Sequence, residues 1–193
     1  MKTAIITWST IHNHGDLWWQ SLELRKKQFV DGQGWDIPHS DTAEWDQYDT
    51  PLTVYCITHD QNRVLASSRL IPCNITPHNG WSYMLHDSVL GKLAGIPAQV
   101  TTLPIEDEHA WEATRFCVDP DLEIDVKNQA LKFNAVALHK LALDLGASKL
   151  FSIMHPGFIR WLKSAGLPAQ RLSKTVVTEN GDKVCAIVMP IRV

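Results

Sequence analysis

The sequence has no long hydrophobic run and no strong excess of charge of either sign. With a formal net charge of −3 over 193 residues, it gives no global indication of a nucleic acid or an acidic membrane as partner. No segment approaches the roughly 20 apolar residues of a membrane helix. The apolar run at the N-terminus is too short for a secretory signal, and no small-residue cleavage site follows it. We therefore expect a cytoplasmic protein with no membrane span and no nucleic-acid partner.

Paired cysteine motifs are also missing. The four cysteines are widely spaced and form no C-x-x-C: Cys56, Cys73, Cys117 and Cys185. Buried free thiols in a reducing compartment are the favoured interpretation, with disulfides as the alternative. The pair His12 and His14 has no cysteine or H-E-x-x-H partner, so we predict no metal site.

The length predicts one domain, residues 1–193. Residues 16–30 predict its first helix, with Asp16 at or near the N-cap. Trp18, Leu22, Arg25 and Phe29 follow the spacing i, i+4, i+7, i+11 and share one stripe of that helix. Arg25 therefore lies on the apolar face, whereas the lysines at 26 and 27 fall outside it.

The remaining pattern alternates strands and helices. After an irregular segment, 31–50, it predicts an antiparallel hairpin (52–58 and 63–72), a short helix near 84–94 and a strand at 110–118. A helix at 127–145 ending at Gly146, a strand at 149–154, a helix at 156–166 and a hairpin around Asn180-Gly181 follow. The predicted fold class is α/β, with a mixed and mostly antiparallel sheet flanked by helices. This order fits the GNAT acyltransferase fold.

The predicted strand W-E-A-T-R-F, residues 111–116, carries a carboxylate and a guanidinium. If side chains alternate, Glu112 and Thr114 point to one face and Arg115 to the other. Such a strand is either an edge wetted on both sides or the floor of an active site.

Three further short pieces are unusually charged for their apolar settings: L-R-K-K-Q-F (24–29), E-W-D-Q-Y-D (44–49) and S-S-R-L-I-P (67–72). With W-E-A-T-R-F they supply Arg25, Arg69 and Arg115 against Glu44, Asp46, Asp49 and Glu112. If the pieces converge, the charges nearly balance, as burial requires. The alternative is a set of separate surface ion pairs, each contributing about 0–1 kcal/mol.

In this order the pieces resemble an acyl-homoserine-lactone synthase of the LuxI type, a branch of the GNAT superfamily. The resemblance runs from about Leu24 to Phe116 and, more weakly, to Gly166. It is carried by Arg25, Phe29, Gly34-Trp35-Asp36, Glu44, Asp46, Asp49, R-L-I-P at 69–72 and W-E-A-T-R-F. The family transfers an acyl chain from an acyl-carrier-protein thioester, or acyl-CoA, to the amine of S-adenosylmethionine. Lactonisation then releases methylthioadenosine and yields a quorum-sensing signal.

The resemblance implies roles for individual residues. Attack on a thioester requires an amine that has lost its proton, so a carboxylate base is needed, for which Glu112 is the candidate. Thr114 would hold the thioester or its pantetheine arm, and Met154 would lie in the acyl tunnel. Residues 1–50 would form an N-terminal helix and a mobile region over the amine-substrate site, ordered by an ionic network of Arg25, Asp46, Asp49, Arg69 and Arg115. Asp46 or Asp49 could instead pair with the cationic end of the substrate. Phe29 and Trp35 would wall the pocket, and S-adenosylmethionine would be a substrate rather than a resident cofactor.

The sequence departs from the wider superfamily before the helix at 127–145. The phosphate-cradling Q/R-x-x-G-x-G/A loop is missing, and the acidic segment V-D-P-D-L-E-I-D stands there instead. This favours a carrier protein over acetyl-CoA as donor. A basic docking patch for that partner is expected among Lys149, Arg160, Lys163, Arg171 and Lys174, although each is equally compatible with an ordinary solvated side chain.

Two alternative functions stay open at this stage. One is a GNAT-fold N-acyltransferase that acts on another amine or amino acid without lactonisation. The other is a ligand-binding or regulatory protein without catalytic turnover.

Overall fold

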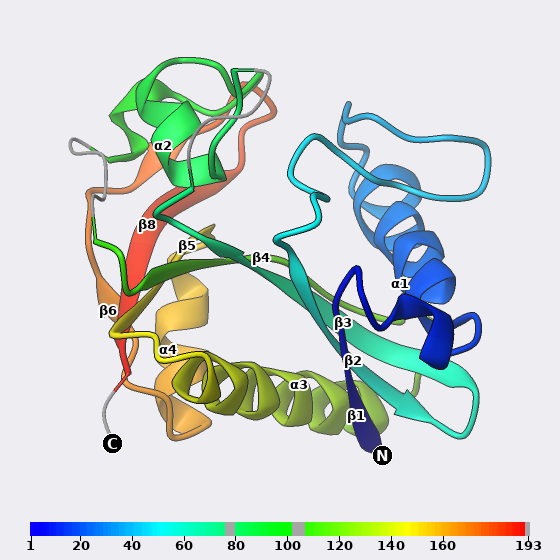
Figure 1. Ribbon diagram of the computed structural model, residues 1–193. Coiled ribbons are helices and arrows are strands. Elements are labelled where there is room, and N and C mark those ends of the chain that lie inside the picture. The colour runs from blue at the N-terminus through cyan, green and yellow to red at the C-terminus, as the bar shows by residue number, and fades with distance from the viewer. Residues whose placement is uncertain (76–79, 102–106, 192–193) are drawn as a thin grey trace. The chain divides into compact units, whose positions relative to one another are not determined.

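The computed structural model describes residues 1–75, 80–101 and 107–191. The chain forms two compact units. Unit 1 comprises Met1–Leu70 and Arg115–Leu138, and unit 2 comprises Ile71–Thr114 and His139–Val193. Strands β3 (Arg63–Pro72) and β4 (Ala110–Val118) and helix α3 (Ile124–Asp144) each run from one unit into the other (Figure 1).

The strands hydrogen-bond in the order β1-β2-β3-β4-β5-β8-β6, and β7 pairs with β8. Strand β4 runs parallel to β5, and the other described pairings are antiparallel. The remaining strands are β1 (Lys2–Ile6), β2 (Val54–Asp60), β5 (Lys149–Met154), β6 (Gln170–Arg171), β7 (Val176–Val177) and β8 (Lys183–Pro190). The predicted α/β class with a mixed, mostly antiparallel sheet and flanking helices is confirmed.

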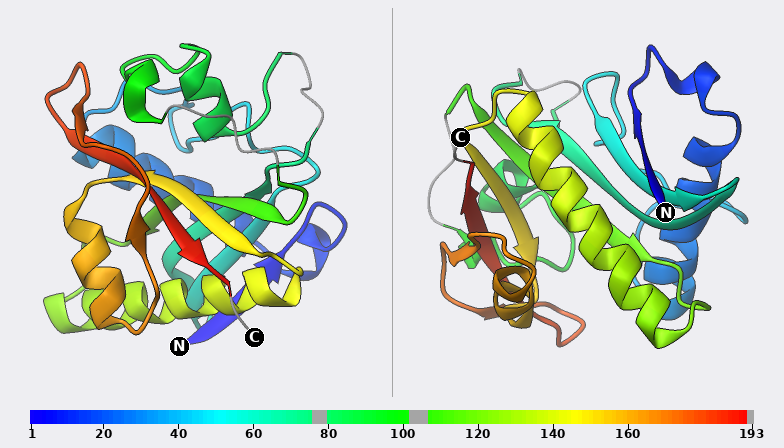
Figure 2. Two further views of the ribbon diagram at one scale, coloured as in Figure 1. Left: turned by 90° about the vertical axis from the view of Figure 1, so that its left-hand side faces the viewer. Right: turned by 90° about the horizontal axis from the view of Figure 1, so that it is seen from below.

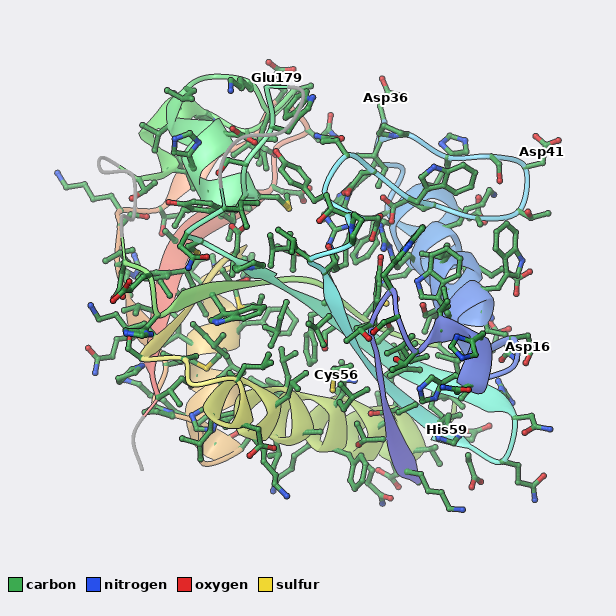
Figure 3. The ribbon with its side chains drawn as sticks, in the orientation of Figure 1. Asp16, Asp36, Asp41, Cys56, His59 and Glu179 are labelled. Atoms are coloured by element: carbon green, nitrogen blue, oxygen red, sulfur yellow. The ribbon has the colours of Figure 1, made fainter. Side chains whose placement is uncertain are left out.

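In unit 1 the strands carry a helix on each face. Helix α1 (Leu17–Arg25) covers the face that presents Tyr55 and Ile57, and the part of α3 before His139 covers the other (Figure 2). Alternation along β2 explains the division, because Cys56 lies between these two side chains in sequence and points toward α3 (Figure 3). There the buried amide of Asn134 donates to the Cys56 carbonyl at 3.0 Å.

A β-bulge in unit 1 changes which side chains of β3 face α1. The register shifts between Thr58 and His59, so that Thr58 pairs with Ala66 whereas His59 pairs with Val64. Val64 packs on the α1 side and Ala66 on the α3 side, although both have even sequence numbers.

Unit 2 is built on β5 and β8, with helix α2 (Met84–Val89) and helix α4 (Gly157–Ser164). The buried apolar residues of β5 include Leu150 and Phe151, and those of β8 include the run from Cys185 to Ile187. The predicted hairpin at Asn180-Gly181 is confirmed as the connection between β7 and β8, with Gly181 at φ 86°.

Helix α3 begins three residues earlier than the sequence predicts. Its C-terminal stop at Gly146 is confirmed: this glycine has φ 74°, its N–H donates to Leu143 O, and Ala147 N–H donates to Ala142 O. This pair of bonds is the Schellman motif, which satisfies the last helical carbonyls.

Strand β1 and the shape of the first helix were not predicted. The first helix ends as an α-helix at Arg25 and continues as a π-helix from Lys26 to Gly32. All four cysteines are free and buried, as expected. Among the described residues, no helix has the length and apolar character needed to cross a membrane.

Candidate active site

Three arginines and three carboxylates of unit 1 form a closed ring of ion pairs. The order around it is Arg25, Glu44, Arg115, Asp46, Arg69, Asp49 and back to Arg25. No side chain of the ring is more than 7% exposed. Each charge lies between two of opposite sign and the sum is zero, which is the condition under which charges can be buried. The predicted convergence is therefore realised within this unit for the three arginines and for Glu44, Asp46 and Asp49, whereas Glu112 is not part of the ring.

Two of the arginines hold their carboxylates by paired hydrogen bonds. Arg25 donates through Nη1 and Nη2 to the two oxygens of Asp49, both at 2.8 Å. Arg69 donates in the same way to Asp46, at 2.7 and 2.8 Å, and its Nη1 is also 2.8 Å from Asp49. This fork geometry fixes orientation as well as distance.

The carboxylates of the ring also fold the loop that carries them. The backbone N–H of Tyr48 donates to Asp46 Oδ1 at 2.9 Å, and that of Asp46 donates to Asp49 Oδ2 at 2.8 Å. Asp36 and Asp41, on the same stretch of chain, point away from the body of unit 1 and are exposed (Figure 3). Only some of the acidic residues of this loop therefore belong to the ring. Their carboxylates accept backbone N–H groups of the loop, which has no regular secondary structure to satisfy them.

The ring shifts the ionisation of its members. Burial would raise the pKa of Asp49, but Arg69 and Arg25 outweigh it and hold that pKa far below its usual range. Burial would also raise the pKa of Asp46, but the charges of Arg69 and Arg115 outweigh burial and lower that pKa. Tyr55 donates its hydroxyl to Asp49 Oδ1 at 2.9 Å, and its pKa is raised by burial and by that carboxylate. Both aspartates are therefore charged at neutral pH.

Arg115 closes the ring from β4. Its Nη2 donates to Glu44 Oε1 at 3.0 Å and to Asp46 Oδ2 at 2.8 Å. The prediction that Arg115 pairs with a carboxylate of the N-terminal region is confirmed for Asp46. Its backbone has φ 52°, a conformation that is rare for a residue with a side chain and costs about 1–3 kcal/mol. Regular alternation along β4 therefore ends at Arg115, which the sequence pattern does not reveal.

Phe29 and Trp35 form an aromatic wall beside Arg115. Their rings stack with centroids 4.8 Å apart and an interplanar angle of 17°, and the Arg115 guanidinium carbon lies 5.6 Å from the Phe29 centroid. The backbone N–H of Trp35 donates to the Phe29 carbonyl at 2.9 Å, so the backbones of the two stacked residues are also joined. All seven predicted residues of unit 1 therefore belong to one connected group.

Glu112 lies in unit 2 and makes a different kind of contact. Its carboxylate is fully buried and accepts the backbone N–H of Met84 at 2.6 Å and of Leu85 at 2.8 Å. These are the first two residues of α2, so the charge lies at a helix N-terminus, where N–H groups lack helical partners. Glu112 is neither exposed nor at a sheet edge, since β4 lies between β3 and β5.

The other two predicted residues of unit 2 lie on neighbouring strands. Thr114 is 8% exposed and follows Glu112 by two positions on β4. Met154 is the last residue of β5, where it pairs with Cys185 of β8. Of the predicted site residues, Glu112, Thr114 and Met154 thus belong to unit 2, and the ring and the aromatic wall to unit 1.

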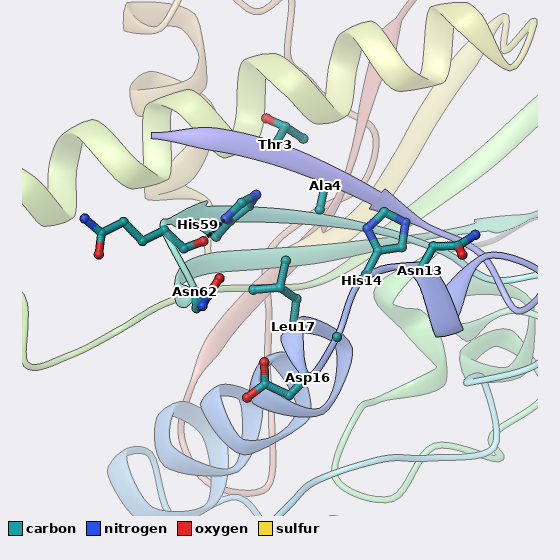
Figure 4. Close-up of a pocket in the computed structure, with 10 residues that line it drawn as sticks. Thr3, Ala4, Asn13, His14, Asp16, Leu17, His59 and Asn62 are labelled. Atoms are coloured by element: carbon teal, nitrogen blue, oxygen red, sulfur yellow. Dashed lines mark hydrogen bonds between the residues drawn. The ribbon is translucent and has the colours of Figure 1, made fainter.

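A polar recess of about 470 Å³ lies elsewhere in unit 1, where α1 begins (Figure 4). It is lined by Thr3, Ala4, Asn13, His14, Gly15, Asp16, Leu17, His59, Gln61 and Asn62. None of the predicted site residues lines it. Within 1–75, 80–101 and 107–191, no group of three potential ligands is placed to hold a metal ion.

Two features of the site were missed from the sequence. Glu44 was grouped with the charged pieces but not assigned to the network, although it bridges Arg25 and Arg115. Its spacing from Asp46 and Asp49 was the available signal. Tyr55, whose hydroxyl donates to Asp49, gave no signal, because an aromatic residue in an apolar strand is ordinary.

Comparison with known proteins gives consistent results. The autoinducer synthase family matches residues 10–192. An acyl-homoserine-lactone synthase of Acinetobacter nosocomialis is 30% identical over 154 residues, which cover 76% of this chain and 78% of that protein. Two solved structures are similar at 24% identity, each with a TM-score of 0.74: TofI in a ternary complex with an inhibitor and MTA, and BjaI, a CoA-dependent acyl-homoserine lactone synthase, with SAM and isopentyl-CoA. The TofI match covers 99% of this chain and 92% of that one, and the BjaI match covers 97% and 82%.

The mixed sheet with its parallel β4–β5 pair and flanking helices is the GNAT-like fold of the similar solved structures, and the family match and curated relatives identify the protein as an acyltransferase. The chain belongs to the autoinducer synthase family, whose members are acyl-homoserine-lactone synthases. The resemblance inferred from the ordered charged pieces is confirmed.

Proposed function

We propose that this acyltransferase joins an acyl chain to the α-amine of S-adenosylmethionine and that lactonisation of the product releases methylthioadenosine. The observation that carries the proposal is the buried, neutral ring with Phe29 packed on its Arg115 member and Trp35 stacked on Phe29. An aromatic wall suits a sulfonium cation. The related proteins TofI and BjaI were solved with MTA and with SAM, respectively.

In this proposal the ring orders the N-terminal region and does not bind the substrate's cation. Asp46 Oδ1 already accepts from Arg69 and from Tyr48 N–H, and Oδ2 accepts from Arg69 and Arg115. A carboxylate oxygen has about two acceptor positions, so a substrate ammonium would have to displace an arginine or the Tyr48 N–H. Direct pairing with Asp46 is therefore the weaker of the two roles that the sequence leaves open.

Glu112 is proposed as the base that takes the proton from the substrate ammonium, directly or through a water. The two N–H donors from Met84 and Leu85 hold its carboxylate in one orientation, and a general base needs such a fixed position. Thr114 and Met154 are proposed to hold the thioester arm and to line the acyl tunnel.

For the acyl donor we propose a carrier protein. The chain between β4 and α3 is acidic, and its Asp119 and Asp121 are both bound to Lys27. A diphosphate at this helix N-terminus would meet carboxylates instead of free N–H groups and basic side chains. Because BjaI is CoA-dependent, acyl-CoA is the alternative donor with which the carrier-protein thioester is to be compared.

To test the proposal, purified protein is incubated with S-adenosylmethionine and either acyl-carrier protein or acyl-CoA whose acyl chains have matched lengths. Lactone and methylthioadenosine are then measured by mass spectrometry. The expected result is equal amounts of both products, with higher kcat/KM for the carrier-protein thioester. Acylated amine without methylthioadenosine would instead indicate an N-acyltransferase that does not lactonise. Folded protein without product at any chain length would refute the proposal. Glu112→Gln is expected to lower kcat by about 100-fold or more, as loss of a general base does.

A further inference from the structure

The π-helix carries two adjacent lysines with different partners. Lys26 pairs with Asp31 of the same element at 2.7 Å, and that carboxylate is 54% exposed. Lys27 instead reaches Asp119 at 2.7 Å and Asp121 at 2.6 Å, in the segment that follows β4. The first pair is local, whereas the second connects chain positions 92 and 94 residues apart.

Asp119 is anchored independently of Lys27. Its backbone N–H donates to the Leu65 carbonyl at 2.8 Å, and its Oδ2 accepts from Arg63. Oδ1 accepts from Lys27 and from the backbone N–H of Asp121. Its side chain is only 8% exposed. Lys27 is therefore tied to a point that the strands of unit 1 already hold in place.

The element that Lys27 ties down is one that needs support. A run of π-helix is rare, commonly occurs at functional sites and is not favoured by local backbone energetics. This one ends at Gly32 and carries Phe29, two residues beyond Lys27. Trp35, three residues beyond its end, donates its N–H to the Phe29 carbonyl. Asp119 follows Arg115 by four residues along the chain. The Lys27–Asp119 pair therefore joins the element that carries Phe29 to the segment that carries Arg115, whose side chains meet at 5.6 Å.

We propose that Lys27 and Asp119 are positioning residues for the aromatic wall: their ion pair sets the π-helix so that Phe29 and Trp35 present a fixed surface to the amine substrate. The proposal rests on the proposed function for the identity of that substrate. Neither residue touches the substrate, so their loss weakens binding of S-adenosylmethionine more than it slows the chemical step.

The test compares Lys27→Met with Lys26→Met. The two variants remove the same charge from adjacent positions of one element, but only the first breaks the link to Asp119. For Lys27→Met and Asp119→Asn, KM for S-adenosylmethionine is expected to rise about fivefold, the effect of losing partly exposed ion pairs, with kcat within about twofold. Lys26→Met is expected to match the parent protein, and Lys27→Arg to restore most of the affinity.

Amide hydrogen exchange of residues 26–35 supplies a readout that does not need activity. Exchange is expected to be faster in Lys27→Met than in Lys26→Met, without a matching change in α3. Equal KM and equal exchange in the two lysine variants would overturn the proposal, as would a fall in kcat at unchanged KM. If the parent protein makes no lactone, the proposed function fails, and faster exchange in Lys27→Met would still support the positioning of the wall.

Discussion

The ring of ion pairs predicts a specific pattern of stability changes. Arg115→Met keeps an apolar side chain against Phe29 but removes one positive charge, so the ring holds two arginines and three carboxylates. Glu44→Gln does the opposite and leaves an excess positive charge. The double variant, Arg115→Met with Glu44→Gln, restores a neutral ring of two arginines and two carboxylates.

The magnitude follows from burial. The Arg115 side chain lies 3.0 Å from Glu44 and 2.8 Å from Asp46, whose side chains are 0% and 3% exposed, so neither carboxylate can turn to bulk water when the arginine is removed. Breaking a buried pair by deleting one partner costs about 3–5 kcal/mol. For a chain of 193 residues, at about 2–4 °C per kcal/mol, this lowers Tm by roughly 6–20 °C. Because the double variant removes charges of both signs, it is expected to lose about 1–3 kcal/mol less than the sum of the single variants.

The assay is urea denaturation of the four proteins at low and high salt, with calorimetry as a second measure. The matched control is Lys26→Met, which breaks an ion pair of the same chain whose carboxylate is 54% exposed and is expected to cost under about 1 kcal/mol. The closed ring would be refuted if each single variant lost as little free energy of unfolding as the control does. Strictly additive losses of this free energy in the double variant would refute it as well. Such a result would mean that these charges are separately solvated.

Two further predictions concern pH and the cap of α2. Because the pKa values of Asp46 and Asp49 are lowered in the folded state, their contribution is fully present above about pH 4, the unfolded value, and is lost as pH falls through the folded values. The free energy of unfolding measured from pH 3 to 7 should therefore fall at the acid end, less steeply in Asp49→Asn, and an identical slope in that variant would contradict the assignment. Glu112→Ala leaves the N–H groups of Met84 and Leu85 without their acceptor, at about 1–3 kcal/mol for each group left unsatisfied. Hydrogen exchange should then accelerate in α2, and unchanged protection there would show that the cap is dispensable.

Local patterns predicted most of the regular structure. Strands β4 and β5 have the residues that alternation and apolar runs indicated, and the stops at Gly146 and Gly181 follow from backbone conformations that glycine adopts easily. The helical stripe also placed Arg25 on the buried face, where it is 1% exposed. That observation was the strongest local sign of a buried charge network, since an arginine is seldom buried without partners.

The misses have physical causes. The sequence predicts a continuous α-helix where the structure has a π-helix from Lys26 to Gly32, because 7 residues are too few to show a side-chain period different from that of an α-helix. Strand β1 was missed because five residues at an edge offer too short a pattern. The conformation of Arg115 was missed because a positive φ at a residue other than glycine is imposed by its partners and not by its own preference.

The sequence by itself determined the fold class, most members of the charged set and the buried thiols, because periodicity, composition and order along the chain act through local preference and burial. Only the tertiary structure decided that Glu44 closes the ring, that Glu112 caps α2 and that Lys27 reaches Asp119. These contacts join positions between 19 and 92 residues apart. At such separations the pairing of charges depends on how the strands bring the segments together, and no local energy term in the sequence specifies it.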